Sequence, residues 1–309
     1  MDQIICVIVT YNRLQLLKES IAAVKSQTRP VDRIIVVDNH STDGTADYLG
    51  TLAQEPLFQI VTMKENVGGS GGFAEGIRKA ALQHADWIWL MDDDTIPTPD
   101  ALERMLPFTQ DAKVGFVNSL VLWTDGTPHL MNGVKKIKNM AKAQHALADS
   151  TGVRPEDIEM ISMASFVSLL VRGDIPWKLG LPYKEFFIWC DDSEYTERIC
   201  KSGYCGVRTR ESIVVHKTPI NCGPSLSTLP VSVAWKAYYG VRNESFLRRK
   251  RKGWLLFFFA QLNCFRTHAR RIKARKLPTE DETKLLRENN RGLWDGFTFN
   301  PQIEYIKND

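Results

Sequence analysis

The first 120 residues of this chain alternate between short apolar runs and longer segments whose apolar residues recur at helical spacing. The short runs are β-branched or bulky and end in polar or glycine-containing turns, which is typical of buried strands. This alternation predicts an α/β fold in which a mainly parallel sheet is covered by helices on both faces. The predicted strands cover residues 4–10, 34–38, 59–63, 87–91 and 114–121.

Helices are expected between these strands. They are predicted over residues 13–26, from the turn 39–44 through residue 52, over 72–84, and from Thr98 with Pro99 through 108.

The second half of the chain has weaker patterns. Residues 125–160 are polar without clear periodicity, and we interpret them as a loop-and-helix insertion over the site-bearing edge of the sheet. Beyond them the sequence predicts a strand over 161–171, a helix over 193–202 closed by Gly203, and a short strand over 213–215 that leads to His216. From about Val231 the pattern becomes helical and basic.

Composition is that of an ordinary soluble globular protein. The 309 residues are 43% hydrophobic and 25% charged, enough for one large domain or a domain with an appendage. The net charge of +4 is unevenly distributed: residues 1–220 carry 23 basic and 28 acidic residues (−5), whereas residues 221–309 carry 17 and 8 (+9). The basic C-terminal part therefore needs its own explanation.

The cysteines and the N-terminus indicate a cytoplasmic protein. Six cysteines form no Cys-x-x-Cys pair and no regular framework, so reduced thiols are expected rather than disulfides or a zinc site. The N-terminus lacks a basic segment followed by a cleavable apolar stretch, so no signal peptide is expected. No run approaches the roughly 18 apolar residues of a transmembrane helix.

Three consecutive aspartates, Asp92, Asp93 and Asp94, directly follow the apolar run 87–91. A strand that ends there places them at the carboxyl edge of the sheet, where open α/β folds bind ligands. Adjacent like charges repel one another, and a divalent cation bound to a phosphate would relieve that repulsion, because hard cations prefer oxygen ligands. Taken alone, the triplet is more simply explained as a solvated acidic turn.

Polar motifs also follow the first three predicted strands. After the first come Thr10, whose hydroxyl can bond a base edge, and Tyr11, whose ring can stack on a base. After the second comes Asp38, which can accept a hydrogen bond from a ribose hydroxyl or from N3–H of uracil. The third is followed by the glycine-rich segment 66–73. Each motif alone has an ordinary structural explanation, but four in succession at strand ends are hard to attribute to chance.

The glycine-rich segment is neither a Walker A loop nor a Gly-x-Gly-x-x-Gly fingerprint. Glycines allow a ligand to approach the backbone closely, and the following helix would point its N-terminus at an anion. A dinucleotide-binding dehydrogenase carries such a loop after its first strand, whereas here it follows the third. This position argues against NAD(P).

Together these motifs resemble the inverting family 2 glycosyltransferases of the GT-A fold. The resemblance rests on residues 9–13, 37–39 with 41–45, 66 with 68–69, and the Asp-x-Asp of Asp92 and Asp94, and it covers roughly residues 4–217. It implies a nucleotide-sugar donor bound through Mn²⁺ or Mg²⁺, which the Asp-x-Asp carboxylates hold. The implied donor-binding residues are Thr10, Tyr11, Arg13, Asp38, Asn66, Gly68, Gly69, Gly71 and Gly72, with Asp93 facing the donor sugar.

A second acidic group precedes the predicted helix 193–202. An inverting transferase needs one carboxylate to deprotonate the acceptor hydroxyl; Asp192 is the candidate and Asp191 the runner-up. Asp192 could instead cap the helix, although capping does not explain the neighbouring acids Asp191 and Glu194. A lone histidine is more often structural than a ligand, but His216 ends a β-branched strand, and imidazole is a good ligand for Mn²⁺.

Residues 66–73, 91–94 and 189–194, with the late histidine, resemble bacterial galactofuranosyltransferases in particular. That resemblance implies UDP-galactofuranose as the donor, Asp92, Asp94 and His216 around the metal, Asp192 as the base, and Trp189 and Glu194 on the acceptor side. The chain is much shorter than the large polymerising members and is expected to lack their N-terminal β-sandwich, which favours the addition of one or a few sugars. The closest alternative donor is dTDP-rhamnose.

The basic segment 236–276 contains 13 Lys or Arg and one acidic residue, Glu244. Its basic run 248–252 is followed by aromatic and aliphatic residues at 254–262. Nine mostly apolar residues cannot span a bilayer, but a basic cluster beside bulky aromatics suits the surface of an anionic membrane. The alternatives are a helix that packs its apolar side on the catalytic domain and a nucleic-acid-binding tail.

The sequence thus predicts a GT-A catalytic domain over residues 1–225 and a basic helical region over 226–309. The expected activity is transfer of a sugar from a UDP-sugar to a glycan or lipid-linked glycan, in synthesis of a cell-surface polysaccharide such as an O antigen. The expected location is the cytoplasmic face of the inner membrane, with no nucleic-acid partner. A nucleotide-sugar-binding module without turnover is the alternative from another class.

Overall fold

The computed structural model describes residues 2–223 and 225–307 and divides the chain into two compact units. The first unit comprises the described residues within 1–184, 192–221 and 303–309. The second comprises those within 185–191 and 222–302. The predicted domain boundary at 225/226 falls close to residue 222, where the longer segment of the second unit begins.

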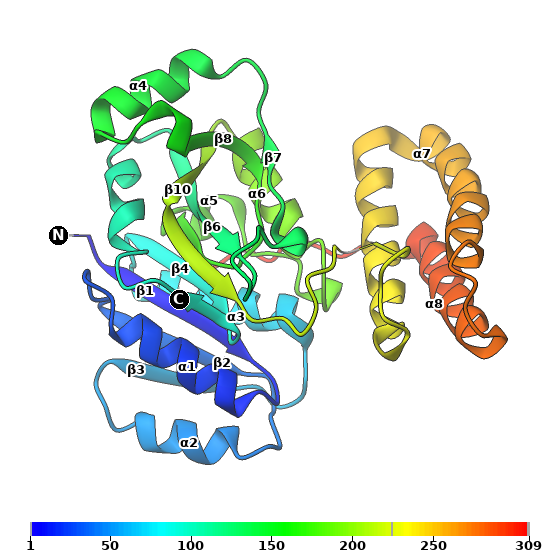
Figure 1. Ribbon diagram of the computed structural model, residues 1–309, viewed down its shortest axis with the longest axis horizontal. Coiled ribbons are helices and arrows are strands. Elements are labelled where there is room, and N and C mark those ends of the chain that lie inside the picture. Colours follow the sequence, from blue (N-terminus) through cyan, green and yellow to red (C-terminus); the bar gives the residue numbers. More distant parts are fainter. Residues whose placement is uncertain (1, 224, 308–309) are drawn as a thin grey trace. The chain divides into compact units, whose positions relative to one another are not determined.

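Within the described residues, the first unit is built on a ten-stranded sheet (Figure 1). Its strands are β1 (Ile4–Thr10), β2 (Arg33–Asp38), β3 (Phe58–Thr62), β4 (Trp87–Asp92), β5 (Thr95–Pro97), β6 (Val114–Leu122), β7 (Lys135–Lys136), β8 (Ile158–Met163), β9 (Leu169–Arg172) and β10 (Cys205–His216). The order is β3-β2-β1-β4-β9-β6-β10-β8-β7, and β5 pairs with β10 outside this path. The long strands β1, β2, β3, β4, β6 and β10 share one direction, because β9 pairs antiparallel with both β4 and β6.

Helices cover both faces of this sheet, as the alternation of segments predicts. Alternate residues of β1 are buried on opposite faces, since successive side chains of a strand point in opposite directions. One face packs against α1 (Leu14–Lys25), α2 (Thr45–Leu52), the 3-10 helix η1 (Glu103–Gln110) and α4 (Ala141–Thr151). The other packs against α3 (Gly68–Leu82), α5 (Ile175–Leu179) and α6 (Asp191–Lys201).

Several predicted elements differ from the structure. The helix predicted from Thr98 through 108 is instead a turn followed by the 3-10 helix η1, which contains Pro107, a residue without a backbone N–H to donate. The single strand predicted over 161–171 is two strands, β8 and β9, separated by residues that include Ser168 with a left-handed φ of 52°. The short strand predicted over 213–215 is the end of the 12-residue β10.

The segment 125–160 is only partly a loop-and-helix insertion. It contains α4, but it also supplies β7 and the first half of β8, which extend the sheet beyond β10. The edge strand β7 was hidden because it consists of two exposed lysines, and the start of β8 was hidden because Glu159 interrupts its apolar residues.

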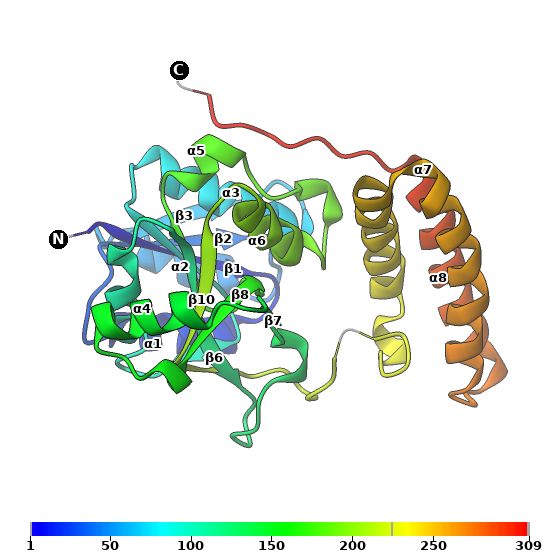
Figure 2. The same ribbon diagram turned by 90° about the horizontal axis from the view of Figure 1, so that it is seen from above.

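The second unit is helical, as the sequence predicts for the basic region. Its main elements are α7 (Trp235–Lys273) and α8 (Thr279–Thr298). Helix α7 is broken at Gly253, whose φ of 74° and ψ of 169° lie outside the helical region. The two halves of α7 lie side by side (Figure 2), and Gln261 Nε2 donates a hydrogen bond to Ser245 Oγ across them.

Two further features bear on the earlier expectations. The six cysteines are free thiols. Among the described residues, no helix combines the length and apolar character needed to cross a membrane.

Candidate active site

Four of the predicted site residues are the last residues of strands. Thr10, Asp38, Asp92 and His216 end β1, β2, β4 and β10, respectively. These strands run in one direction, so their carboxyl ends meet at one edge of the sheet. The glycine-rich segment and Asp94 belong to the connections that leave the same edge.

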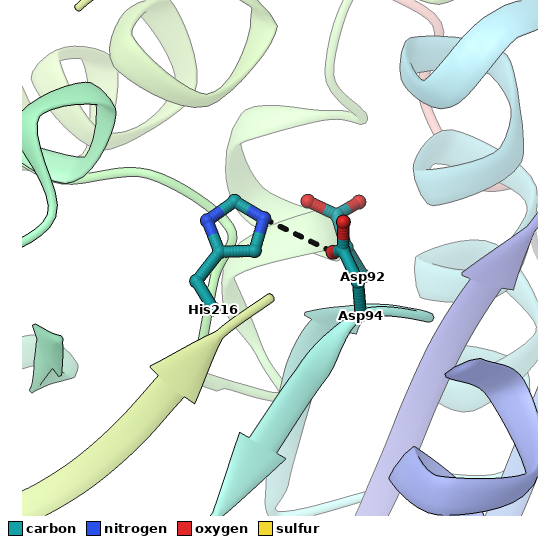
Figure 3. A group of neighbouring side chains, drawn as sticks. All are labelled: Asp92, Asp94 and His216. Carbon is teal, nitrogen blue, oxygen red and sulfur yellow. Dashed lines mark ion pairs between the residues drawn. The ribbon is translucent and has the colours of Figure 1, made fainter. Parts of the chain in front are cut away.

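At this edge the structure brings together Asp92, Asp94 and His216, the three residues predicted to hold a metal (Figure 3). One ligand atom of each lies within 4.8 Å of the others. The convergence follows from strand pairing: β5 pairs antiparallel with the end of β10, and His216 lies opposite Thr95. Asp94 therefore arrives directly beside His216, and its carbonyl accepts a 2.8 Å hydrogen bond from the backbone N–H of Lys217.

The electrostatics of this group are those of a buried ion pair. Burial by itself raises the pKa of Asp94, but the facing imidazole of His216 and the guanidinium of Arg13 outweigh it and lower that pKa to about 2. Burial acts to lower the pKa of His216, and the carboxylates of Asp94 and Asp92 reverse this and raise it. Without another cation, the imidazole thus favours its charged form.

Two residues that the sequence did not single out fix the ring of His216. Asn132 Oδ1 lies 2.8 Å from Nδ1 of His216 and, being an acceptor, holds the proton on that nitrogen. Nε2 is then directed toward the carboxylates. The ring of His129 packs at 4.5 Å from the His216 ring, and burial with the neighbouring His216 charge lowers the pKa of His129 to about 4. No recognisable motif surrounds His129 or Asn132, which lie in the segment without periodicity.

These residues fit a divalent cation. His216 Nε2 lies 3.0 Å from Oδ1 of Asp94, an ion-pair distance, yet that buried oxygen has no hydrogen-bond partner among the described residues. Two carboxylates and an imidazole nitrogen, held by a carbonyl-type acceptor on the far side of the ring, form a donor set suited to Mn²⁺. A cation there would satisfy the orphaned oxygen and replace the imidazole proton.

Asp93 has different surroundings from its two neighbours. Its Oδ2 accepts a 2.8 Å hydrogen bond from Thr10 Oγ1, and its Oδ1 lies 3.3 Å from a guanidinium nitrogen of Arg13. The same nitrogen is 2.5 Å from Asp94 Oδ2. Burial raises the pKa of Asp93 to about 7, against the opposing charge of Arg13. Arg13 therefore links the predicted nucleotide side of the site to the metal side.

The glycine-rich segment is the first turn of α3 rather than a loop, so the predicted helix start at residue 72 is late by one turn. Asn66 Oδ1 accepts from the N–H of Gly68, and buried Asn39 donates to the carbonyl of Gly68. A side chain at Gly72 would meet Val9 at 2.6 Å, so this glycine lets α3 pack directly on β1, whereas Gly69 faces open space. Gly69 is thus where a ligand can approach the N-terminus of α3.

Asp192, the predicted base, also contacts the backbone at the start of α6. Asp192 lies in the first turn of α6, and its Oδ1 accepts a 2.6 Å hydrogen bond from the N–H of Ser193. Both carboxylate oxygens of Glu194 contact Arg198, one turn along the helix. Asp192 and Glu194 thus both make contacts within α6. Their roles toward an acceptor stay predictions.

Aromatic contacts connect α6 to the beginning of α3. Phe73 packs on Phe166 at 4.8 Å, and Phe166 contacts Tyr195 at 6.1 Å. The helix that carries Asp192 and the helix that carries the glycines are thereby held over the same face of the sheet. The remaining predicted residues lie elsewhere. Tyr11 is 43% exposed, and Asp38 is buried and accepts a hydrogen bond from the N–H of Ser41. Trp189 and Asp191 belong to the second unit.

Comparison with known proteins agrees with this architecture. The family model "Glycosyl transferase family 2" matches residues 5–169. The galactofuranosyltransferase GlfT1 of Mycolicibacterium smegmatis is 29% identical over 203 residues, which are 65% of this chain and 67% of that protein. The galactofuranosyltransferase GlfT1 of Mycobacterium tuberculosis is 26% identical over 255 residues, 80% of this chain and 82% of the relative.

Solved structures share the fold at low sequence identity. GalNAc-T7, crystallised with UDP, GalNAc and Mn²⁺, matches 94% of this chain with a TM-score of 0.62 and 13% identity; the chain spans about half, 54%, of that protein. The mannosyltransferase PcManGT of Pyrobaculum calidifontis, in complex with GDP-Man and Mn²⁺, matches 95% of this chain and 88% of its own, with a TM-score of 0.58 and 18% identity.

The chain belongs to glycosyl transferase family 2. It has the GT-A fold and is an inverting glycosyltransferase similar to galactofuranosyltransferases, as the sequence motifs indicate.

Proposed function

We propose that this protein transfers galactofuranose from UDP-galactofuranose to a hydroxyl group of a glycan or lipid-linked glycan, and that it requires Mn²⁺ or Mg²⁺. The observation that carries the proposal is the convergence of Asp92, Asp94 and His216 at the strand edge that also bears Thr10 and Asp38. The two galactofuranosyltransferase relatives favour this sugar over the rhamnose of dTDP-rhamnose.

The donor is assigned to the carboxyl edge of β1, β2 and β4. The exposed ring of Tyr11 stacks on uracil, Asp38 accepts from the base or ribose, and the open N-terminal turn of α3 at Gly69 faces the diphosphate. Asp92, Asp94 and His216 would hold the cation, which would supply positive charge against the charge that develops on the departing UDP. Asp93, held by Thr10 and Arg13, faces the donor sugar.

Transfer proceeds by one displacement at the anomeric carbon. Asp192 takes the proton of the acceptor hydroxyl while its oxygen attacks the face opposite UDP. The new carbon–oxygen bond forms as the bond to the diphosphate breaks, so an α-linked donor gives a β-linked product. Trp189 and Glu194 are assigned to the acceptor side, and the product belongs to a cell-surface polysaccharide such as an O antigen.

Metal dependence is tested by calorimetry of UDP binding with and without chelator. With Mn²⁺ present, Asp94→Asn and His216→Ala are expected to weaken UDP binding by at least about tenfold, because each removes a donor to the cation. His145→Ala is the matched control, since His145 is exposed on α4, and it should bind like the wild type. Equal affinity of the wild type in chelator and in Mn²⁺ would contradict the metal assignment.

The base is tested by a transfer assay with UDP-galactofuranose, and dTDP-rhamnose, UDP-galactose and UDP-glucose as competing donors. Asp192→Asn should lower kcat by roughly 10²–10⁴-fold, the usual contribution of a general base, while UDP binding is retained. Asp191→Asn is the paired control. Loss of transfer in Asp191→Asn alone would move the base to Asp191, and transfer of rhamnose alone would overturn the donor.

We assign to the second unit a contact with an anionic membrane. This membrane carries the lipid-linked acceptor, and the contact is at the cytoplasmic face of the inner membrane. Large apolar side chains gather on α7 just after the break at Gly253, and one more lies on α8. This aromatic patch comprises Trp254, Leu255, Leu256, Phe258, Phe259, Leu262 and Trp294, each between 47% and 73% exposed.

Ring contacts connect the part of the patch on α8 to the part on α7, and basic residues precede the patch in the chain. Trp294 contacts Phe297 at 5.8 Å, and Phe258 contacts Phe297 at 6.5 Å, which joins the two helices. The run Lys250, Arg251 and Lys252 immediately precedes it and is exposed. Apolar rings next to basic side chains suit insertion at an anionic interface, where each Lys or Arg adds about 1 kcal/mol.

Vesicle sedimentation tests this contact. The wild type should bind vesicles of phosphatidylglycerol and phosphatidylcholine more strongly than phosphatidylcholine alone, and less strongly at high salt. Leu255→Glu with Phe259→Glu should abolish the binding, whereas Leu130→Glu, an equally exposed leucine of the first unit, should not. If the double variant instead converts a dimer to a monomer in light scattering, without any effect on vesicle binding, the patch joins two copies of the chain.

A further inference from the structure

The segment that leads into α6 has an unusual backbone. Phe187, Trp189 and Cys190 have φ values of 66°, 67° and 70°, in the left-handed region that side-chain-bearing residues rarely adopt. Such conformations are unfavourable and persist only where the surroundings enforce them, frequently at active sites. The next residues along the chain are Asp191 and Asp192.

The enforcing group is the amide of Asn243 on α7. Asn243 is fully buried, and its Nδ2 donates to the carbonyls of Phe186, Ile188 and Trp189 at 3.0, 3.1 and 3.0 Å. These bonds tie three carbonyls of the segment to one side chain of α7, and the carbonyl of Phe186 also accepts a 2.7 Å hydrogen bond from the N–H of Ile188. Asn243 Oδ1 accepts from Nε and Nη2 of Arg242, which orients the amide.

Neighbouring residues of α7 complete the hold on this segment. Arg242 Nη2 donates to the carbonyl of Glu185 at 2.7 Å. The ring of Phe187 stacks on Tyr239 at 4.6 Å with an interplanar angle of 19°. A side chain at Gly240 would meet the Trp189 ring at 2.7 Å, so the indole lies directly on the helix backbone.

We propose that Asn243 is a positioning residue of the transfer reaction. Its amide holds segment 186–190 in the left-handed form, and the covalent connection into α6 thereby sets the first helical turn, which carries Asp191 and Asp192. Trp189 is set by the same contacts. The inference rests on the proposed role of Asp192, and it makes the C-terminal helices, which lie beyond the part matched by the family model, a component of the catalytic apparatus.

The amide serves the fold and the segment together. A buried amide stabilises a protein where it is hydrogen-bonded, and an apolar side chain at position 243 would leave the carbonyls of Phe186, Ile188 and Trp189 without this donor. Here the amide of Asn243 binds a segment in which three residues have left-handed φ values. The benefit falls on the residues that the segment orients.

The isosteric variant Asn243→Asp removes the donor without changing the shape. Its carboxylate keeps the contact with Arg242 but repels the three carbonyls that the amide binds. Hydrogen exchange of the backbone amides at 187–190 should become faster, and kcat should fall by about 10²-fold, the effect of a misplacement of about 1 Å. The affinity for UDP with Mn²⁺ should stay within about twofold, since the predicted donor residues belong to the first unit.

Asn289→Asp is the matched control. Asn289 is equally buried in the second unit, where its Oδ1 contacts His268, so the variant reports the effect of a buried charge away from segment 186–190. It should retain the wild-type kcat. An Asn243→Asp protein that is folded, binds UDP and transfers at the wild-type rate would overturn the proposal, as would equal losses of kcat in both variants.

Gly240→Ala provides an independent test if Asn243→Asp does not fold. Alanine favours the helix, but its methyl group must displace the Trp189 ring, so we expect a higher KM for the acceptor with unchanged UDP affinity. Wild-type KM and wild-type exchange at 187–190 would count against the proposal. Hydrogen exchange and UDP affinity are measured without turnover. If the wild type transfers no sugar, the proposed function is wrong, but the effect of Asn243 on segment 186–190 can still be measured by exchange.

Discussion

The site depends on one strand pairing. The three-residue strand β5 lies antiparallel to the end of β10 and sets Thr95 opposite His216, which brings a histidine from late in the chain beside the carboxylates that end β4. The aspartates 92–94, which end and follow β4, concentrate negative charge at this edge of the sheet. Arg13 and a charged His216 compensate it, since a guanidinium nitrogen lies 2.5 Å from Asp94 Oδ2 and His216 Nε2 lies 3.0 Å from Asp94 Oδ1.

The two units have separate tasks in this account. The first carries the strand-end residues assigned to the donor and the cation. The second, beyond the region of the family model, carries the exposed aromatic patch and the amide of Asn243 that enforces a strained segment. Helix α7 thereby contains both the surface that we propose for membrane contact and the side chains that contact the residues preceding Asp192.

Much of the sheet of the first unit was predictable from the sequence, because its strands near the N-terminus are buried on both faces and therefore consist of apolar runs. Their ends located Thr10, Asp38 and Asp92, and the family resemblance added His216. The exposed edge strand β7 and the first half of β8 were missed, because Lys135, Lys136 and Glu159 interrupt the apolar pattern. Asn132 and Asn243 were missed because a buried amide acts through backbone and ring partners that only the tertiary structure brings to it.

The central claim is that Asp92, Asp94 and His216 hold a divalent cation at the junction of β4, β5 and β10. Crystals grown with UDP and Mn²⁺, measured at the manganese absorption edge, test it most directly. The account predicts an anomalous peak in contact with His216 Nε2, the Asp92 and Asp94 carboxylates, and the diphosphate. Bound UDP without a peak there, or with a peak at other residues, would contradict it.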